Sequence, residues 1–168
     1  MVTVKAYQSG MALLEALIGI LIFSLGIVAM VAMQAASVNT VADAQYRIEA
    51  VNAANQVLSQ MWVNVDRSNA TTVQNSLLAF EHQTSGAPET CDFTGAAATN
   101  PAVLAWVGLV TTGTADFSGS KPLLPGVTDT MQQVDVEVGA TNRVTITVCW
   151  RAPNDTAPRR HTVVAYVN

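Results

Sequence analysis

The stretch that decides the fold runs from Met11 to Met33 and reads MALLEALIGILIFSLGIVAMVAM. Its only charged residue is Glu15, and its only other polar side chain is Ser24. A helix needs roughly 20 apolar residues to cross the hydrocarbon core of a bilayer, because each residue adds about 1.5 Å to a core of about 30 Å. The sequence therefore predicts a membrane-spanning helix over residues 11–33.

Ten residues, MVTVKAYQSG, precede this stretch and carry a single cation, Lys5. A secretory signal peptide would explain a short stub before an apolar run, with a cleavage site near Ala35 and Ala36. The apolar run is longer than the usual h-region of about 7 to 15 residues, however. A deeply inserted carboxylate also costs about 2.5 to 3.5 kcal/mol. Neither a signal peptide nor an ordinary membrane anchor gives Glu15 a reason to be there.

The hexapeptide Gly10-Met11-Ala12-Leu13-Leu14-Glu15, followed by the apolar run, resembles the N-terminal signature of type IV pilins and the related pseudopilins. The resemblance implies that residues 1–10 are a leader, that a prepilin peptidase cuts after Gly10, and that Met11 becomes the methylated N-terminus. It also implies that Glu15 of one subunit pairs with the amine of Met11 on a neighbour. Such a pair, buried among apolar helices, would fix the axial register of subunits in a filament.

The helix is expected to continue beyond the membrane, because residues 34–63 contain neither Pro nor Gly. This amphipathic half carries an apolar stripe at three-and-four spacing that is interrupted only by Asn55. The stripe consists of Ala44, Ile48, Val51, Leu58 and Trp62. It is widened by Ala50, Ala54, Val57 and Met61. A stripe of this width predicts a helix that packs on a sheet and not one that forms a narrow coiled-coil seam.

Alternating residues predict an antiparallel β-meander over residues 134–168. Residues 134–138 and 143–151 alternate apolar and polar side chains around a short turn, and 161–167 forms a third run. Residues 64–133 are interpreted as a connecting region that contains a loop around Cys91. Within it, the apolar run 102–110 fits either a buried strand or a short helix, and the pattern does not decide between them.

The expected fold is therefore α+β and pilin-like: a long N-terminal helix, with a transmembrane half and an amphipathic half, packed on a small antiparallel sheet. Cys149 is expected on the sheet face away from the helix, where the Cys91 loop would cover it. A disulfide between Cys91 and Cys149 is the simpler interpretation, and two buried free thiols are the alternative.

Composition argues against several other classes of function. The 168 residues carry a net charge of −4, and the few basic residues form no stripe that would follow a nucleic-acid backbone. His82 and His161 accompany no nucleophile or metal-ligand cluster and are expected to be surface groups. Asp135 and Glu137 alternate with Val as on the solvent side of a sheet. The sequence therefore predicts neither an enzyme nor a cofactor.

Further segments narrow the resemblance to PilV-type minor pilins. They are LGIVAMVAMQ at the end of the apolar stretch, Trp106 followed by Leu124-Pro125-Gly126, and the strand VTITVCWR from Val144 to Arg151. The resemblance implies a single-pass protein of the bacterial inner membrane with a periplasmic head that later joins the pilus. Its expected partners are the prepilin peptidase, other minor pilins and the major pilin. A minor pseudopilin of type II secretion has a nearly identical N-terminus and remains an alternative.

Overall fold

The structure is a computed structural model that describes residues 9–113, 115–116 and 119–168. Most of the predicted leader over residues 1–10 therefore lies outside the described residues. The chain divides into two compact units within its first helix, between Ala42 and Asp43. That helix, α1, comprises Ser9–Asn64.

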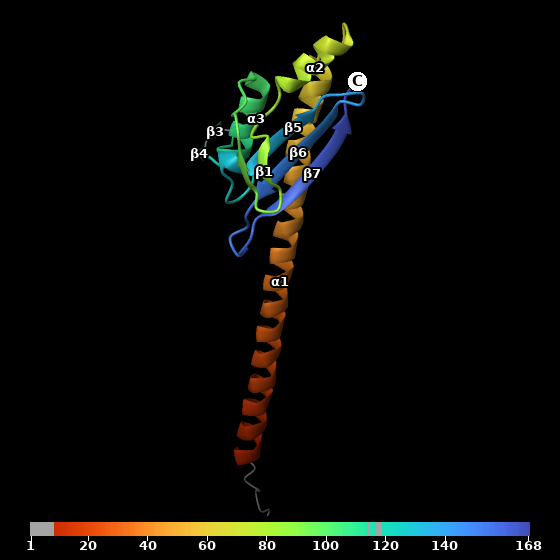
Figure 1. Ribbon diagram of the computed structural model, residues 1–168. Coiled ribbons are helices and arrows are strands. Elements are labelled where there is room, and N and C mark those ends of the chain that lie inside the picture. Colours follow the sequence, from red (N-terminus) through yellow and green to blue (C-terminus); the bar gives the residue numbers. More distant parts are fainter. Residues whose placement is uncertain (1–8, 114, 117–118) are drawn as a thin grey trace, which may run out of the picture. The chain divides into compact units, whose positions relative to one another are not determined.

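The described part of the first unit consists of α1 alone (Figure 1). From Met11 to Val41 every residue is exposed, and Ala42 is half-buried. The predicted helix over residues 11–33 is confirmed. Its backbone stays helical across Gly19 and Gly26, because the surrounding Leu, Ile, Ala and Met residues have little or moderate cost in a helix and no Pro interrupts them.

The second unit contains the rest of α1 and all remaining elements. Its other helices are α2 (Ala70–Leu78), α3 (Pro101–Thr111) and the 3-10 turn η1 (Asp129–Met131). Its strands are β1 (Ser85–Ala87), β2 (Asp92–Thr94), β3 (Ala115–Asp116), β4 (Gly119–Ser120), β5 (Gln132–Glu137), β6 (Arg143–Trp150) and β7 (Arg159–Tyr166). The unit is α+β, as the sequence predicts.

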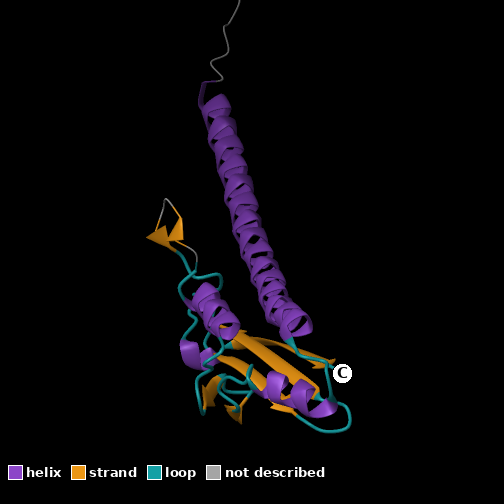
Figure 2. Cartoon of the chain, turned by 90° about the horizontal axis from the view of Figure 1, so that it is seen from above, coloured by secondary structure: helices purple, strands orange, loops and turns teal. Residues whose placement is uncertain are grey.

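The main sheet is an antiparallel meander in the order β5-β6-β7, which lies beside the C-terminal half of α1 (Figure 1, Figure 2). Its register places Val134 opposite Ile146 and Ile146 opposite Val163, so apolar residues share the inner face. The predicted strands are confirmed with ends shifted by one or two residues. In the β5–β6 turn, the side-chain Oδ1 of Asn142 accepts a hydrogen bond of 3.2 Å from the N–H of Gly139.

The core of the second unit lies between α1, α3 and the inner face of the sheet. From α1 it takes Ala50, Ala53, Ala54, Val57 and Met61, and from β6 it takes Val144, Ile146, Val148 and Trp150. Small alanines let α3 approach α1 closely enough for the indole Nε1 of Trp106 to donate a 2.8 Å hydrogen bond to the carbonyl of Ala53. This bond satisfies a buried donor and joins two elements that are distant in sequence.

The predicted apolar stripe of α1 is corrected by the structure. Of its five members, Ala44, Ile48 and Trp62 are exposed, with Ile48 59% and Trp62 46% accessible, and Val51 and Leu58 are only partly buried. The residues that were expected to widen the stripe form the buried face instead, together with Ala53. At 3.6 residues per turn the two stripes lie about 120° apart around the helix, so one sheet cannot cover both.

The predicted connecting region contains a helix that the periodicity did not reveal. Helix α2 begins with a capping box, in which the Oδ1 of Asn69 accepts from the N–H of Thr72 at 2.9 Å. The Oγ1 of Thr72 in turn accepts from the N–H of Asn69 at 3.0 Å. The helix buries Val73 and Leu77 against the core. These two capping bonds stabilise a helix of only nine residues.

The apolar run 102–110 is a helix, which settles the alternative that the sequence left open. The signal lies just before the run: the Oδ1 of Asn100 accepts from the N–H of Ala102 at 2.9 Å, and Pro101 occupies the first helical position. Asn at the N-cap and Pro at N1 are both typical helix starts. The helix buries Val103, Trp106, Val107 and Val110.

Candidate functional site: the exposed apolar helix and the covered sheet face

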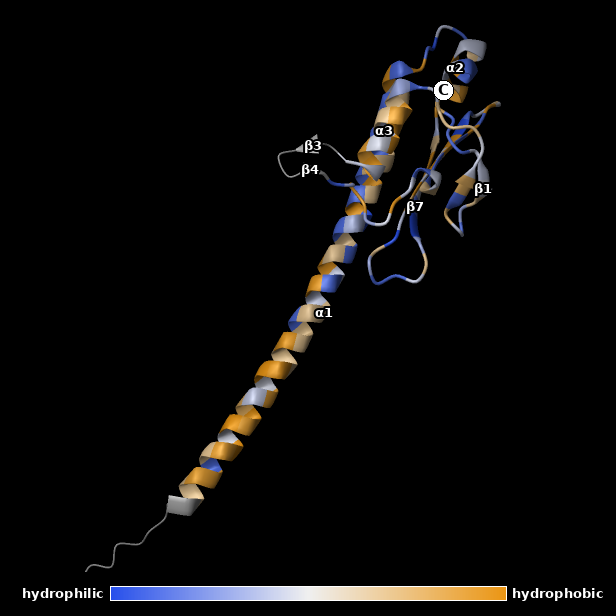
Figure 3. Ribbon diagram, turned by 90° about the vertical axis from the view of Figure 1, so that its left-hand side faces the viewer, coloured by the Kyte–Doolittle hydropathy of each residue, from blue (hydrophilic) through white to orange (hydrophobic). Residues whose placement is uncertain are grey.

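The candidate site in the first unit is the apolar surface of α1 (Figure 3). The helix contains a window of mean hydropathy 2.7 in which no residue is buried. Large side chains along it are mostly exposed, for example Phe23 at 70%. Soluble monomers rarely expose a continuous apolar surface of this size. The helix is long and apolar enough to cross a membrane, and it fits burial in lipid or among other helices.

The two polar side chains on this surface, Ser24 and Glu15, differ in their hydrogen bonding. The Oγ of Ser24 donates a 2.8 Å hydrogen bond to the carbonyl of Leu21 in its own helix. Glu15 has no hydrogen-bond or ion-pair partner among residues 9–113, 115–116 and 119–168. In an apolar environment a carboxylate needs such a partner. Glu15 is therefore the one charged side chain of this apolar surface, and it would need a partner wherever lipid or other helices surround α1.

The other predicted N-terminal site residues lie in the first turn of the same helix. Gly10 and Met11 are the second and third residues of α1, so the predicted cleavage bond joins two helical residues. Met11 is exposed and lies four residues before Glu15, on the same helix face. Met11 and Glu15 therefore share one face of α1 because of the helical repeat. Residues 1–8 of the predicted leader fall outside the described residues.

In the second unit, Cys91 and Cys149 form a disulfide with a Cα–Cα distance of 5.9 Å. The structure thus favours the bonded interpretation over two free thiols. Cys149 is fully buried on the sheet face away from α1, and the segment around β2 covers it as predicted. Cys91, Phe93, Met131 and Cys149 make a second, smaller core there. Closing a loop of this length stabilises the fold by about 4 kcal/mol through loop entropy.

The expectation that His82 is a surface group is wrong, because its side chain is only 3% exposed. Its Nδ1 accepts a 3.1 Å hydrogen bond from the N–H of Ala98. Its backbone exchanges two 2.9 Å hydrogen bonds with Val134 of β5. Burial lowers the pKa of His82, and the backbone and charge of Asp129 partly oppose this shift. His82 therefore ties its loop to the sheet as a neutral side chain, while His161 in β7 is half-buried.

The acidic residues of β5 lie at the outer side of the sheet, as expected. Glu137 is exposed and forms an ion pair with Arg143 of the facing strand. Asp135 is half-buried, and desolvation followed by repulsion from Glu137 raises its pKa. Glu81 lies near Asp135, and its pKa is raised first by burial and then by that carboxylate. The three carboxylates thus form a cluster near the surface, and Arg143 neutralises part of its negative charge.

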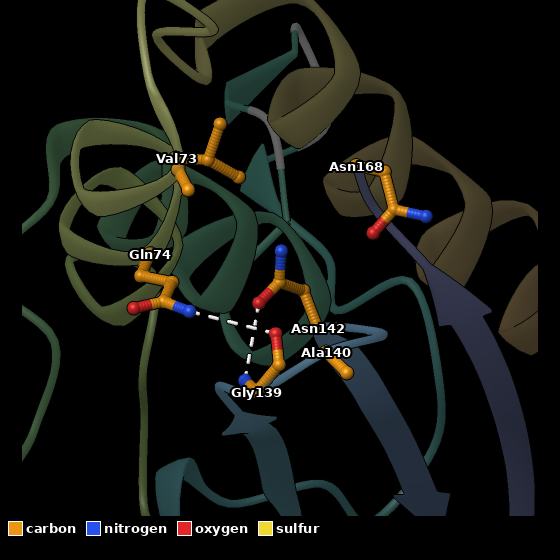
Figure 4. A pocket seen from close by; sticks show the side chains of 7 residues that line it. Val73, Gln74, Gly139, Ala140, Asn142 and Asn168 are labelled. Carbon is orange, nitrogen blue, oxygen red and sulfur yellow. Dashed lines mark hydrogen bonds between the residues drawn. The ribbon is translucent and has the colours of Figure 1, made fainter.

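A cavity of about 380 Å³ lies between α2, the β5–β6 turn and the C-terminal residue (Figure 4). Three amide side chains line it, from Gln74, Asn142 and Asn168. The Nε2 of Gln74 lies 3.5 Å from the carbonyl oxygen of Gly139, so one of these amides already bridges the cavity wall. Side-chain amides do not titrate near neutral pH, and they both donate and accept hydrogen bonds. These three side chains therefore offer hydrogen bonds to whatever enters the cavity.

Among the described residues, no group of three or more His, Cys, Asp or Glu side chains could hold a metal ion. The sequence and the structure thus point to the surface of α1 and its lone carboxylate as the distinguishing feature of the chain. Comparison with known proteins finds no matching family model, no matching curated protein and no matching solved structure.

Proposed function

We propose that this chain is a minor pilin of a type IV pilus, a structural subunit that helps to initiate or modify pilus assembly within a minor-pilin complex. The observation that carries the proposal is the exposed apolar stretch of α1 over residues 11–33, whose single carboxylate, Glu15, lies five positions after Gly10. In this proposal the inner membrane holds α1 before assembly, and neighbouring helices bury it afterwards. Its partners are the prepilin peptidase, other minor pilins and the major pilin.

Glu15 supports this proposal because its chemistry suits a filament core better than a monomeric anchor. A carboxylate without a partner in the described structure is costly in an apolar environment, whereas a neighbour's N-terminal amine would compensate it. Attraction between such charges is far stronger in a low-dielectric core than at a surface. Cleavage after Gly10 would create that amine on Met11, four residues from Glu15.

The disulfide supports a periplasmic head. Structural disulfides persist in oxidising compartments such as the periplasm and are rare in the cytosol. The Cys91–Cys149 bond is buried and joins the loop around β2 to the central strand of the sheet. This placement fits a second unit that folds after export and a first unit that stays in the membrane.

A structural role, with no cofactor, fits how the titratable groups of the second unit are used. Arg159 forms ion pairs with Asp43 at 3.0 Å and with Asp155 at 2.6 Å, which fastens the start of β7 to α1. His82 is engaged by Ala98, and Glu137 by Arg143. Each of these groups makes a contact that holds the second unit together, which supports an assembly function.

The test is mass spectrometry of the intact protein and its N-terminal peptide, isolated from its native membranes. A chain that begins at a methylated Met11 supports the proposal, and one that begins at Met1 or near Ala36 contradicts it. Gly10→Ala should reduce processing, whereas the matched control Gly19→Ala should be processed normally, because a Cβ at Gly19 meets nothing within 4 Å. Deletion should reduce surface pili; an intact pilus with lost protein secretion would indicate a type II pseudopilin instead.

A further inference from the structure

The cavity beside α2 gathers side chains from three separate segments of the second unit (Figure 4). Its volume is about 380 Å³. Small-molecule sites usually have volumes of roughly 300 to 1,000 Å³, so this one suits a ligand of about one ring and its substituents. The lining consists of Ala70, Val73 and Gln74 from α2, Gly139, Ala140 and Asn142 from the β5–β6 turn, and Asn168.

Asn142 supplies a buried hydrogen-bond donor to this cavity. The residue is only 8% exposed, and its Oδ1 accepts the bond from the N–H of Gly139. That bond fixes the orientation of the amide, because the flipped amide would place two donors against each other. The Nδ2 group therefore points away from the turn, into the space between Val73 and Asn168, and it donates to no described residue (Figure 4). Since a buried donor without an acceptor is costly, a ligand must present an acceptor to Nδ2.

The other lining residues decide what else the ligand must present. Val73 is buried and supplies an apolar wall, and the seven described lining residues include no charged side chain. The Nε2 of Gln74 reaches the carbonyl oxygen of Gly139 only at 3.5 Å. This distance exceeds the usual 2.7–3.2 Å, so the amide can exchange that weak bond for one to a ligand. Asn168 is exposed and adds a second amide at the rim.

We propose that this cavity binds an N-acetylated sugar, with the acetamido group innermost. The acetamido carbonyl oxygen accepts from the Nδ2 of Asn142, and the acetamido methyl group packs on Val73. Carbonyl and methyl stand on the same planar carbon, as a donor beside an apolar wall requires. The ring hydroxyls exchange hydrogen bonds with Gln74 and Asn168, because hydroxyls and amides both donate and accept.

Ligands of other chemistry fit the same lining less well. A charged ligand would lose hydration without gaining a counter-charge from the lining. A purely apolar ligand would bury the Nδ2 of Asn142 without an acceptor. A sugar without the acetamido group would place a hydroxyl against Val73, where no described lining residue satisfies it. An extended peptide carries suitable carbonyls, but it continues in both directions, whereas α2 and the turn bound this cavity.

The test is NMR spectroscopy of the full-length chain in detergent micelles, labelled with an NMR-active nitrogen isotope. Titration with N-acetylglucosamine should shift the side-chain amide signals of Asn142 saturably. The expected midpoint is about 1 mM, as for a small ligand held by a few hydrogen bonds. Two probes divide the ligand: glucose has the ring without the acetamido group, and N-acetylalanine N-methylamide has the acetamido group without the ring. Each should bind about ten-fold more weakly, or not at all.

Two pairs of variants test the assigned contacts. Asn142→Asp removes the donor but keeps an oxygen for the N–H of Gly139, and it should weaken binding about ten-fold. Its matched control, Asn75→Asp, is exposed on α2 outside the cavity and should bind normally. Ala140→Leu adds bulk to the lining from an exposed turn position and should also weaken binding. Thr141→Leu, in the same turn but outside the lining, is the control for bulk.

Several results would overturn the proposal. They are no shift of the Asn142 signals at about ten times the expected midpoint, equal shifts with glucose, or unchanged binding in Ala140→Leu. Tighter binding of the peptide analogue would assign the cavity to a protein segment instead of a sugar. If Asn142→Asp does not fold, the Ala140→Leu and Thr141→Leu pair still decides the outcome. The readout requires neither cleavage after Gly10 nor assembly, so it stands or falls apart from the pilin assignment.

Discussion

At the scale of single residues, the side chain of His82 accepts a hydrogen bond from the N–H of Ala98 that only its neutral form can accept. The Nδ1 that accepts from Ala98 has no free lone pair once the imidazole is doubly protonated. Burial lowers the pKa of this side chain below its ordinary value of 6.5. The unfolded chain therefore takes up a proton at a higher pH than the folded chain, and stability decreases as the pH falls through that interval.

We predict that the free energy of unfolding of the full-length protein falls between pH 7.5 and pH 5.5. Urea unfolding followed by tryptophan fluorescence at several pH values measures it. His82→Gln should be less stable at pH 7.5 but should show a flatter profile over this range. The raised pKa values of Glu81 and Asp135 act with the opposite sign, because these acids bind protons more readily when folded. Equal slopes for both proteins would contradict the assignment.

Gly126 is a residue whose backbone conformation and close contacts restrict substitution. Its φ is +60°, and a Cβ there would lie 2.7 Å from the carbonyl oxygen of Arg151. The N–H of Arg151 donates to the carbonyl of Pro125, so this segment cannot move away without breaking a bond that fastens it to the end of β6.

Gly126→Ala should therefore reduce the free energy of unfolding by about 1 to 3 kcal/mol, the usual range for strain in this conformation. The matched control is Gly139→Ala, because a Cβ at Gly139 meets nothing within 4 Å. We expect the control to change stability by less than about 0.5 kcal/mol. Thermal or urea unfolding compares the two variants. Similar losses in both would show that glycine flexibility, and not the clash with Arg151, sets the cost.

At the scale of elements, regular alternation and long apolar runs predicted most of what the structure contains. The strands of the meander and the extent of α1 follow from patterns that repeat over many residues. Helix α2 was missed because its nine residues carry only two buried side chains, and its signal is the cap at Asn69. Periodicity also found an apolar stripe on α1 but could not tell which of two stripes faces the sheet, since both repeat at the same interval.

Because α2 is short, its stability should depend strongly on its cap. Asn69→Ala removes the acceptor for the N–H of Thr72 and should cost about 1 kcal/mol in unfolding free energy. Asn69→Asp should retain most of that stability, since Asp caps helices equally well. The control Asn75→Ala, at an exposed position of the same helix, should have little effect. Hydrogen exchange of the α2 amides would locate the loss, and unchanged exchange there would contradict it.

At the scale of the whole molecule, the two units differ in where their apolar side chains lie: the second unit buries many of them in a core, and the described part of the first unit exposes them. The second unit could be predicted as α+β because it buries its apolar residues. The structure contains the disulfide between Cys91 and Cys149 that the sequence favoured over two free thiols. The burial of His82 was not predictable, because it depends on tertiary contacts with Ala98 and Val134. The apolar half of α1 was readily predicted, because an uninterrupted apolar stretch of this length is by itself a sufficient signal for a long helix.

If the chain is the minor pilin proposed above, a change at Glu15 should affect assembly and leave folding intact. Glu15→Ala and Glu15→Gln should insert into the membrane, be cleaved after Gly10 and unfold with the same free energy as the unmodified chain. Both should be strongly depleted from purified pili, because a buried amine left without its carboxylate costs about 3 to 5 kcal/mol. Ser24→Ala is the matched control: Ser24 is the other polar side chain of the stretch and bonds only to its own helix, so its loss should preserve incorporation. Immunoblots of sheared pili and membranes measure the ratio. Normal incorporation of Glu15→Gln would show that hydrogen bonding suffices without charge, and normal incorporation of Glu15→Ala would remove the carboxylate from the assembly mechanism altogether.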